Sequence, residues 1–150
     1  MVSVLGLDIG RKRIGVAGCD GTGLIATGLM TIERGSFEQD VAQLRKLVAA
    51  RQVQLLVIGM PYNADGGLGA QAKQTQKLAK RLSTALDLPV EYLDERLTSF
   101  QAEQMMIEEG QSPSRQKAVI DRKAAALILQ EWLDTRRQQE KSCQLERSHS

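Results

Sequence analysis

The stretch that decides the fold is Val4-Leu5-Gly6-Leu7-Asp8-Ile9-Gly10-Arg11-Lys12-Arg13-Ile14-Gly15-Val16-Ala17. Its two apolar halves predict paired strands, and the basic segment between them predicts the tight turn of a β-hairpin. Asp8 stands near the end of the first strand, where burying an ionised carboxylate without a partner would be very costly. We therefore expect Asp8 to bind a cation, to join a hydrogen-bond network or to lie near water. The alternative is a capped turn in which Asp8 pairs with a neighbouring arginine.

The composition is that of an ordinary globular domain. The chain has 150 residues, of which 42% are hydrophobic and 25% are charged, and this length is enough for one domain with a substantial core. Its net charge of +2 neither requires nor excludes nucleic acid as a partner. Two distant cysteines and a single histidine argue against a zinc cluster. Because Met1 leads directly into the first strand and no apolar run reaches membrane-spanning length, we expect a cytoplasmic protein with no membrane association.

Beyond the hairpin, extended and helical patterns alternate. The predicted elements are a third strand over 24–32, a helix capped by Ser36, a buried strand over 55–59, a glycine-rich loop over 62–69, a helix over 70–86, a strand over 90–96, a short helix ending at Gly110 and a last helix from about Gln116 through Leu133. This order predicts an α/β fold, a mixed five-stranded sheet with helices on both faces. Few apolar residues follow Arg136, so we expect one domain over 1–137 and a disordered polar tail over 138–150.

Three acidic positions stand out because a packed core would avoid them. Asp8 is the first, and the pair Asp94-Glu95 at the end of the predicted fifth strand is the second. Asp121 is the third, since helical spacing puts it on the same face as the apolar positions that should pack on the sheet. Its alternative role is a favourable charge near a helix N-terminus. Adjacent strand residues face opposite sides, so only one of Asp94 and Glu95 can join Asp8, and strand alternation alone leaves that choice open.

Converging carboxylates without histidine or cysteine indicate a site for a hard cation, Mg²⁺ or Mn²⁺, which prefers oxygen ligands. Two such ions can activate water and stabilise the leaving oxygen in phosphodiester hydrolysis. The turn Arg11-Lys12-Arg13 lies beside Asp8 in sequence and could hold a polyanionic backbone. Lys73, Lys77, Lys80 and Arg81 could extend this basic track, although the ordinary interpretation of those four is the solvated face of a helix.

Four segments in order resemble the motifs of the YqgF (RuvX) family of Holliday-junction-resolvase-like proteins and pre-16S rRNA nucleases. They are Leu5 to Ala17, Gly59-Met60-Pro61 with Asp65-Gly66, Asp94-Glu95-Arg96-Leu97-Thr98-Ser99, and Asp121 to Leu129. The resemblance covers about residues 3–135 and implies an RNase H-like fold. It also implies a metal-dependent nuclease that matures the 5′ end of small-subunit rRNA, with Asp8, Glu95 and Asp121 as catalytic residues and metal ligands. Arg11, Lys12, Arg13, Lys73, Lys77 and Arg96 are then the expected nucleic-acid contacts.

Other functions remain open at this point. A glycine-flanked Asp in a hairpin also begins nucleotide-binding modules of the actin and sugar-kinase type, but those close a nucleotide between two such domains. A Holliday junction resolvase and a catalytically silent RNA-binding assembly factor are further alternatives. The aromatic residues are few and scattered, which argues against base stacking as the main mode of recognition. RNA or DNA as substrate, endonuclease or exonuclease action, and monomer or homodimer are not determined.

Overall fold

The computed structural model describes residues 3–20, 25–61, 67–94 and 117–148, with the side chains of 117–121 and 139–148 excepted. The described strands form one sheet in the order β3-β2-β1-β4-β5. Their bounds are β1 Val4–Ile9, β2 Arg13–Cys19, β3 Ala26–Glu33, β4 Leu55–Met60 and β5 Val90–Asp94. β1 pairs antiparallel with β2 and parallel with β4, and β4 pairs parallel with β5. The expected mixed five-stranded sheet is confirmed.

The hairpin predicted from the first stretch is present. Ile9 faces Ile14 across the β1–β2 pair, and the Gly10 amide donates to the Arg13 carbonyl over 2.8 Å to close the turn. β3 returns along β2, so that Arg13 stands opposite Glu33. The residue after β3 therefore lies beside the first turn, and the Arg34 amide donates to the Lys12 carbonyl over 2.9 Å.

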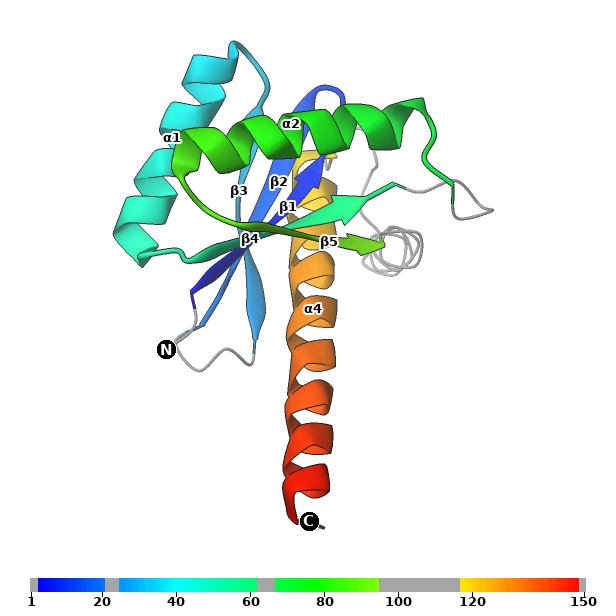
Figure 1. Cartoon of the computed structure of the whole chain (residues 1–150). Helices are drawn as coiled ribbons and strands as arrows, with labels where there is room; N and C mark the ends of the chain where they lie inside the picture. Colours follow the sequence, from blue (N-terminus) through cyan, green and yellow to red (C-terminus); the bar gives the residue numbers. More distant parts are fainter. Residues whose placement is uncertain (1–2, 21–24, 62–66, 95–116, 149–150) are drawn as a thin grey trace, which may run out of the picture.

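Helices cover both faces of the sheet (Figure 1). α1 (Phe37–Arg51) and α2 (Ala70–Leu86) lie on one face. Large aliphatic side chains fill the core there, among them Leu5, Leu7, Ile14, Leu44, Ile58 and Leu82. α4 (Lys117–Ser148) lies on the other face, where the core contains Val4, Ala17, Val57, Ala125, Ile128 and Leu129. Successive residues of β1 therefore alternate between two separate cores.

Local sequence signals account for the two shorter helices. The Ser36 hydroxyl accepts from the Gln39 amide over 3.2 Å, which is the expected N-cap of α1. α2 has the predicted bounds and buries Ala79 and Leu82. Both helices end at a residue in the left-handed conformation, Gln52 with φ 51° and Asp87 with φ 55°, so that the chain turns back towards the sheet.

The C-terminal segment differs from the expectation of a disordered tail. α4 continues as a helix through Ser148, although the last buried residue described on it is Leu133. The physical reason is helix propensity, because residues 117–148 contain neither glycine nor proline and are rich in glutamine, glutamate, arginine and leucine. No helix in the described part of the chain is both long enough and apolar enough to cross a membrane. The predicted short helix ending at Gly110 and most of the 62–69 loop lie outside the described residues.

Candidate active site and nucleic-acid interface

Asp8 lies near the carboxyl end of the central strand β1. The pairing of β1 with β4 ends at Leu7–Ile58, whereas its pairing with β2 continues through Asp8–Gly15 and beyond. Asp8 is half-buried, and strand alternation gives it the same side of the sheet as Val4, which packs in the α4 core. The carboxyl ends of parallel strands in open α/β sheets are where ligands usually bind. Asp8 thus lies at this edge of the sheet, on the side of α4.

The other parallel strands end at the same edge. Met60, the last residue of β4, stands opposite Asp94, the last residue of β5. Asp94 is half-buried. Glu95 follows it directly but lies outside the described residues, as does Arg96. The structure therefore brings one acid of the Asp94-Glu95 pair to the edge where Asp8 lies and does not describe the other.

α4 approaches the sheet very closely beside β1 and β3. A Cβ atom built at Gly6 would lie 2.8 Å from the Leu129 Cβ, and one at Gly28 would lie 3.1 Å from the Arg122 Cβ. The Ala26 amide donates to the Gln130 Oε1 over 2.9 Å. Because the later residue of β3 meets the earlier residue of α4, the helix runs antiparallel to β3, and hence to β1.

Asp121 belongs to the N-terminal part of α4, but its side chain is not among those described. Within the described residues no group of three or more His, Cys, Asp or Glu side chains could hold a metal ion. Glu95 and the side chain of Asp121 are not among the described residues, so the three-acid site remains a prediction. Its donors would all be carboxylate oxygens, which suit Mg²⁺ or Mn²⁺.

The basic turn is exposed and its backbone is held in place. Arg11 and Lys12 are exposed and Arg13 is half-buried. The Arg34 Nη1 donates to the Gly10 carbonyl over 2.8 Å and to the Arg11 carbonyl over 3.5 Å. One guanidinium thus fixes the turn that carries the predicted phosphate-binding residues.

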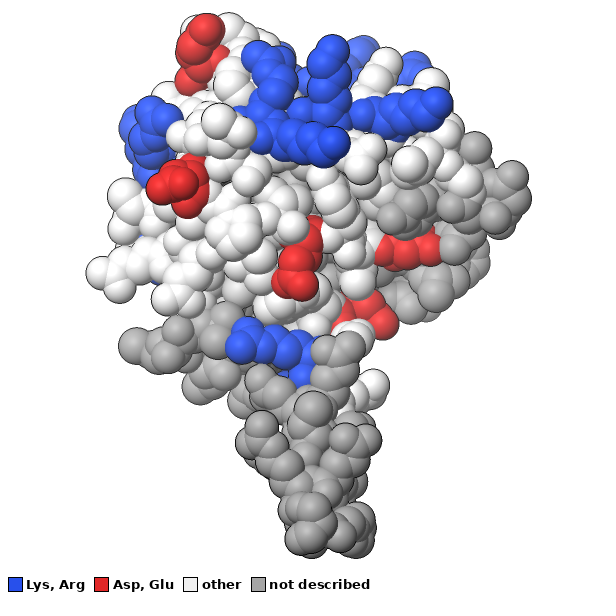
Figure 2. Space-filling model, in the orientation of Figure 1, with Lys and Arg blue, Asp and Glu red and all other residues white. Residues whose placement is uncertain are grey.

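Lysines and arginines gather over α2 in Figure 2, while the acidic residues visible on that face are scattered. Lys73 and Lys77 are exposed, as expected from their helix face. Beside them, a hollow of about 270 Å³ separates α2 from the β1–β2 turn. Its lining residues are Ile9, Gly10, Arg11, Arg34, Gln71, Gln74, Thr75, Lys77, Leu78 and Arg81.

Arg34 and Thr75 are members of this hollow that the sequence interpretation missed. Arg34 had a detectable signal, because the residue that follows the third strand of a meander must return beside the first turn. Thr75 had none, since it is one of many polar residues in the sequence of α2. Arg81 was assigned with less weight to the basic track, and the structure places it at the hollow.

Comparisons with known proteins agree with this arrangement. A family model described as "RuvX: Holliday junction resolvase" matches residues 2–135. A Trichormus variabilis protein named "Putative pre-16S rRNA nuclease" is 68% identical over 136 residues, which cover 91% of this chain and 90% of the relative. A protein of the same name from Crocosphaera subtropica is 65% identical over 136 residues, covering 91% of this chain and 95% of the relative.

Among solved structures, the chain resembles T. thermophilus RuvC in complex with a Holliday junction substrate. The TM-score is 0.53 at 13% identity, and the match covers 85% of this chain and 92% of the RuvC chain. At that identity the likeness shows the fold alone, which is the expected RNase H-like fold. The family model and the close relatives carry the identification, and from them the chain belongs to the RuvX family of nucleases.

Proposed function

We propose that this chain is a metal-dependent nuclease whose reaction centre lies between the carboxyl end of β1 and the N-terminal part of α4, and that its substrate is precursor 16S rRNA. The observation that carries the proposal is the placement of Asp8, half-buried at the end of the central strand and on the side of α4. The names of the close relatives support the RNA substrate. The cytoplasm, where ribosomal RNA is processed, is the proposed location.

The antiparallel course of α4 supports Asp121 as a second ligand. Gly6 of β1 meets the helix at Ala125, whose carbonyl oxygen would lie 3.0 Å from a Cβ at Gly6. Asp8 lies two residues further along β1, an advance of about 6.6 Å. Asp121 lies four residues back along α4, a step of about 6 Å in the same direction. The two steps are nearly equal, so positions 8 and 121 lie at nearly the same level along β1 and α4, as a shared ion needs.

Alternation along β5 favours Glu95 over Asp94 as the third ligand. Leu93 packs against the α4 core, and Glu91 accepts a hydrogen bond from the Trp132 Nε1 of α4 over 3.1 Å. Alternation puts position 95 on the same face as Glu91 and Leu93. Asp94 falls on the face of Val90, which packs against the opposite core. Glu95 therefore completes the proposed set with Asp8 and Asp121.

The proposed residues have two roles, metal binding and phosphate binding. Asp8, Glu95 and Asp121 would hold Mg²⁺ or Mn²⁺, which supplies activation of the attacking water and stabilisation of the leaving oxygen when bound. Pairing with β2 holds the main chain of Asp8 in place, so its carboxylate needs little reorganisation. Arg11, Lys12 and Arg13 would bind phosphates of the strand, together with Lys73, Lys77 and Arg96. Because phosphate contacts carry no base information, they would orient different nucleic acids in a similar way.

Cleavage assays with two substrates test this proposal. We would incubate the purified protein with a precursor 16S rRNA fragment and with a four-way DNA junction, each with Mg²⁺, with Mn²⁺ and with chelator. The expected result is cleavage of the RNA that requires the divalent ion and falls by about 100-fold or more in Asp8→Asn. Asp20→Asn is the matched control, because Asp20 is an exposed acid at the end of β2.

The outcomes separate the alternatives. Nucleic-acid binding should survive Asp8→Asn, because the proposed phosphate contacts are other residues. Cleavage of the junction alone would favour the second candidate, a Holliday junction resolvase, which the description of the matching family supports. If neither substrate is cleaved with either ion, and Asp8→Asn fully replaces the natural protein in cells, the chain acts as a silent assembly factor.

A further inference from the structure

We infer that the hollow between the β1–β2 turn and α2 is a binding site for one phosphate group, separate from the three-acid centre. Four cationic side chains line it, from three segments of the chain: Arg11, Arg34, Lys77 and Arg81. No carboxylate is among the lining residues, and none of the four forms an ion pair with a described residue. Like charges gathered around one hollow repel each other, and a bound anion would offset this repulsion.

A buried hydroxyl independently indicates a ligand. Thr75 lines the hollow with only 3% of its surface exposed, and its hydroxyl makes no hydrogen bond to any described residue. A buried hydroxyl without a partner destabilises the folded chain, because the hydrogen bonds that it makes to water in the unfolded chain are not replaced. By contrast, Thr84 on the same helix donates to the Lys80 carbonyl over 3.1 Å. An oxyanion in the hollow would give the Thr75 hydroxyl an acceptor.

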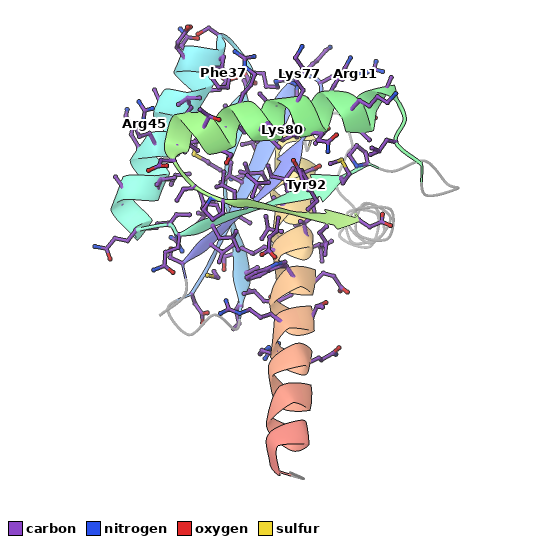
Figure 3. The ribbon with its side chains drawn as sticks, viewed as in Figure 1. Arg11, Phe37, Arg45, Lys77, Lys80 and Tyr92 are labelled. Atoms are coloured by element: carbon purple, nitrogen blue, oxygen red, sulfur yellow. The ribbon has the colours of Figure 1, made fainter. Side chains whose placement is uncertain are left out.

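Two of the cations are held in place before any ligand arrives. Arg34 is fixed by its hydrogen bonds to the Gly10 and Arg11 carbonyls. The Arg81 guanidinium carbon lies 4.0 Å from the centroid of the Phe37 ring, in a cation–π contact. Preorganised groups lose less conformational freedom on binding than free ones. Figure 3 labels Arg11, Phe37 and Lys77 on the same part of the molecule.

The hollow lies across the sheet from Asp8. Ile9 lines it and packs in the core under α1 and α2. Asp8 precedes Ile9 on the strand and therefore faces the opposite side of the sheet. A strand cleaved beside α4 would therefore place a different phosphate in this hollow, over the edge of the sheet. This assignment of the ligand to the nucleic acid rests on the proposed function. The same chemistry would also accept a free phosphate.

Paired variants test the site. Lys77→Gln/Arg81→Gln removes two lining cations of α2, and Lys46→Gln/Lys80→Gln removes two exposed cations of α1 and α2 that do not line the hollow. We expect the first pair to weaken binding of a fluorescent RNA by about tenfold or more at fixed salt, and the second by less than about threefold. Equal losses would overturn the inference, because they would indicate a general electrostatic field.

Thr75→Val gives a second test, because this substitution changes no charge. We expect about tenfold weaker RNA binding with an unchanged salt slope, and a higher Tm of the free protein, because an unsatisfied hydroxyl has been removed. Thr84→Val should show neither effect. A fall in both Tm and affinity would overturn the inference, since it would show that the hydroxyl supports the fold instead of a ligand.

Inorganic phosphate separates the two sources of the ligand. If the site serves a nucleic-acid strand, Lys77→Gln/Arg81→Gln raises KM for RNA and leaves kcat within about twofold, and millimolar phosphate competes only weakly. If the site serves free phosphate, phosphate alone raises Tm in the natural protein but not in the variant, and RNA binding is unaffected. If neither effect is observed, the inference is overturned. RNA binding that depends on the hollow in a protein without cleavage activity would refute the proposed function and leave this site standing.

Discussion

The two faces of the sheet are built on different principles. Against α4 the sheet presents two glycines among smaller apolar residues, and a Cβ at Gly6 would lie 2.8 Å from the Leu129 Cβ while one at Gly28 would lie 3.1 Å from the Arg122 Cβ. Against α1 and α2 it presents full-sized aliphatic side chains such as Leu5, Leu7 and Ile14. The close face brings the backbone of α4 next to that of β1, as the proposed metal site would require. The other face leaves room for a hollow at its edge.

The faces also separate opposite charges. Asp8 belongs to the side of α4, while the next residue, Ile9, belongs to the side where four cations surround the hollow. Unit charges about 4 Å apart attract strongly in a partly buried site, and the strand keeps these four cations apart from Asp8. The proposed acidic centre and the proposed phosphate site therefore lie on opposite faces of the sheet.

The largest expected effect comes from filling the close face. Gly6→Ala should lower the free energy of unfolding by about 1–3 kcal/mol, and Gly6→Val by more, because the new Cβ would lie 2.8 Å from the Leu129 Cβ and 3.0 Å from the Ala125 carbonyl oxygen. Urea denaturation measures both.

Gly35→Ala is the control for this substitution. Its Cβ would approach only the end of the Gln39 side chain, with Oε1 at 2.7 Å and Cδ at 3.9 Å, and that side-chain end can move away. We expect a change below about 0.5 kcal/mol there. A Gly6→Ala protein as stable as the natural one would show that α4 does not contact β1 closely, and the offset between Asp8 and Asp121 would lose its support.

The next effect concerns the basic turn. Replacing Arg11, Lys12 and Arg13 with alanine should weaken binding by a similar factor for different RNA and DNA molecules. It should also reduce the slope of log K against log salt by about 2, since each phosphate contact on a single strand contributes roughly 0.7. Lys12→Ala alone should remove about 0.7, and Lys46→Ala, an exposed lysine of α1, should leave the slope unchanged. Loss of binding to a single sequence would contradict backbone recognition.

Those predictions rest on elements that were predictable from sequence because their signals are local. The hairpin followed from two apolar runs around a basic turn, α1 from the cap at Ser36, and α2 from its helical spacing over 70–86. The position of Asp121 on the packing side of the last helix is likewise inferred from the apolar periodicity after it, and it stays a prediction. None of these inferences needs contacts between distant residues.

The hollow was not predictable because three segments build it. Arg34, Arg11 and Thr75 lie far apart in the chain, and only the meander and the packing of α2 bring them together. The course of the last helix beyond Leu133 was also not predicted, because apolar content and helix propensity give opposite indications there. Glu95 and the Asp121 side chain remain predictions from the family resemblance and from strand and helix phase.

A smaller effect should follow from removing a hydrogen bond between α4 and the edge strand β5. The Trp132 Nε1 donates to the Glu91 Oε2 over 3.1 Å, and this bond joins the close face to β5, which precedes Glu95. Trp132→Phe and Glu91→Gln should each cost about 1 kcal/mol or less, since the bond is exposed. A double-mutant cycle monitored by urea denaturation should give a coupling of roughly 0.5 kcal/mol. Zero coupling would show that the bond does not hold the strand to the helix.

The smallest effect should come from removing residues 138–150, which tests where the close face ends. Buried residues described on α4 stop at Leu133, and α4 extends beyond the sheet in Figure 1. A helical extension without tertiary packing is marginal in water. We therefore expect the shortened chain to keep its free energy of unfolding, measured by urea denaturation, within about 0.5 kcal/mol. A loss above about 2 kcal/mol would contradict a domain that ends at 137, because it would mean that the last turns of α4 contact the folded core.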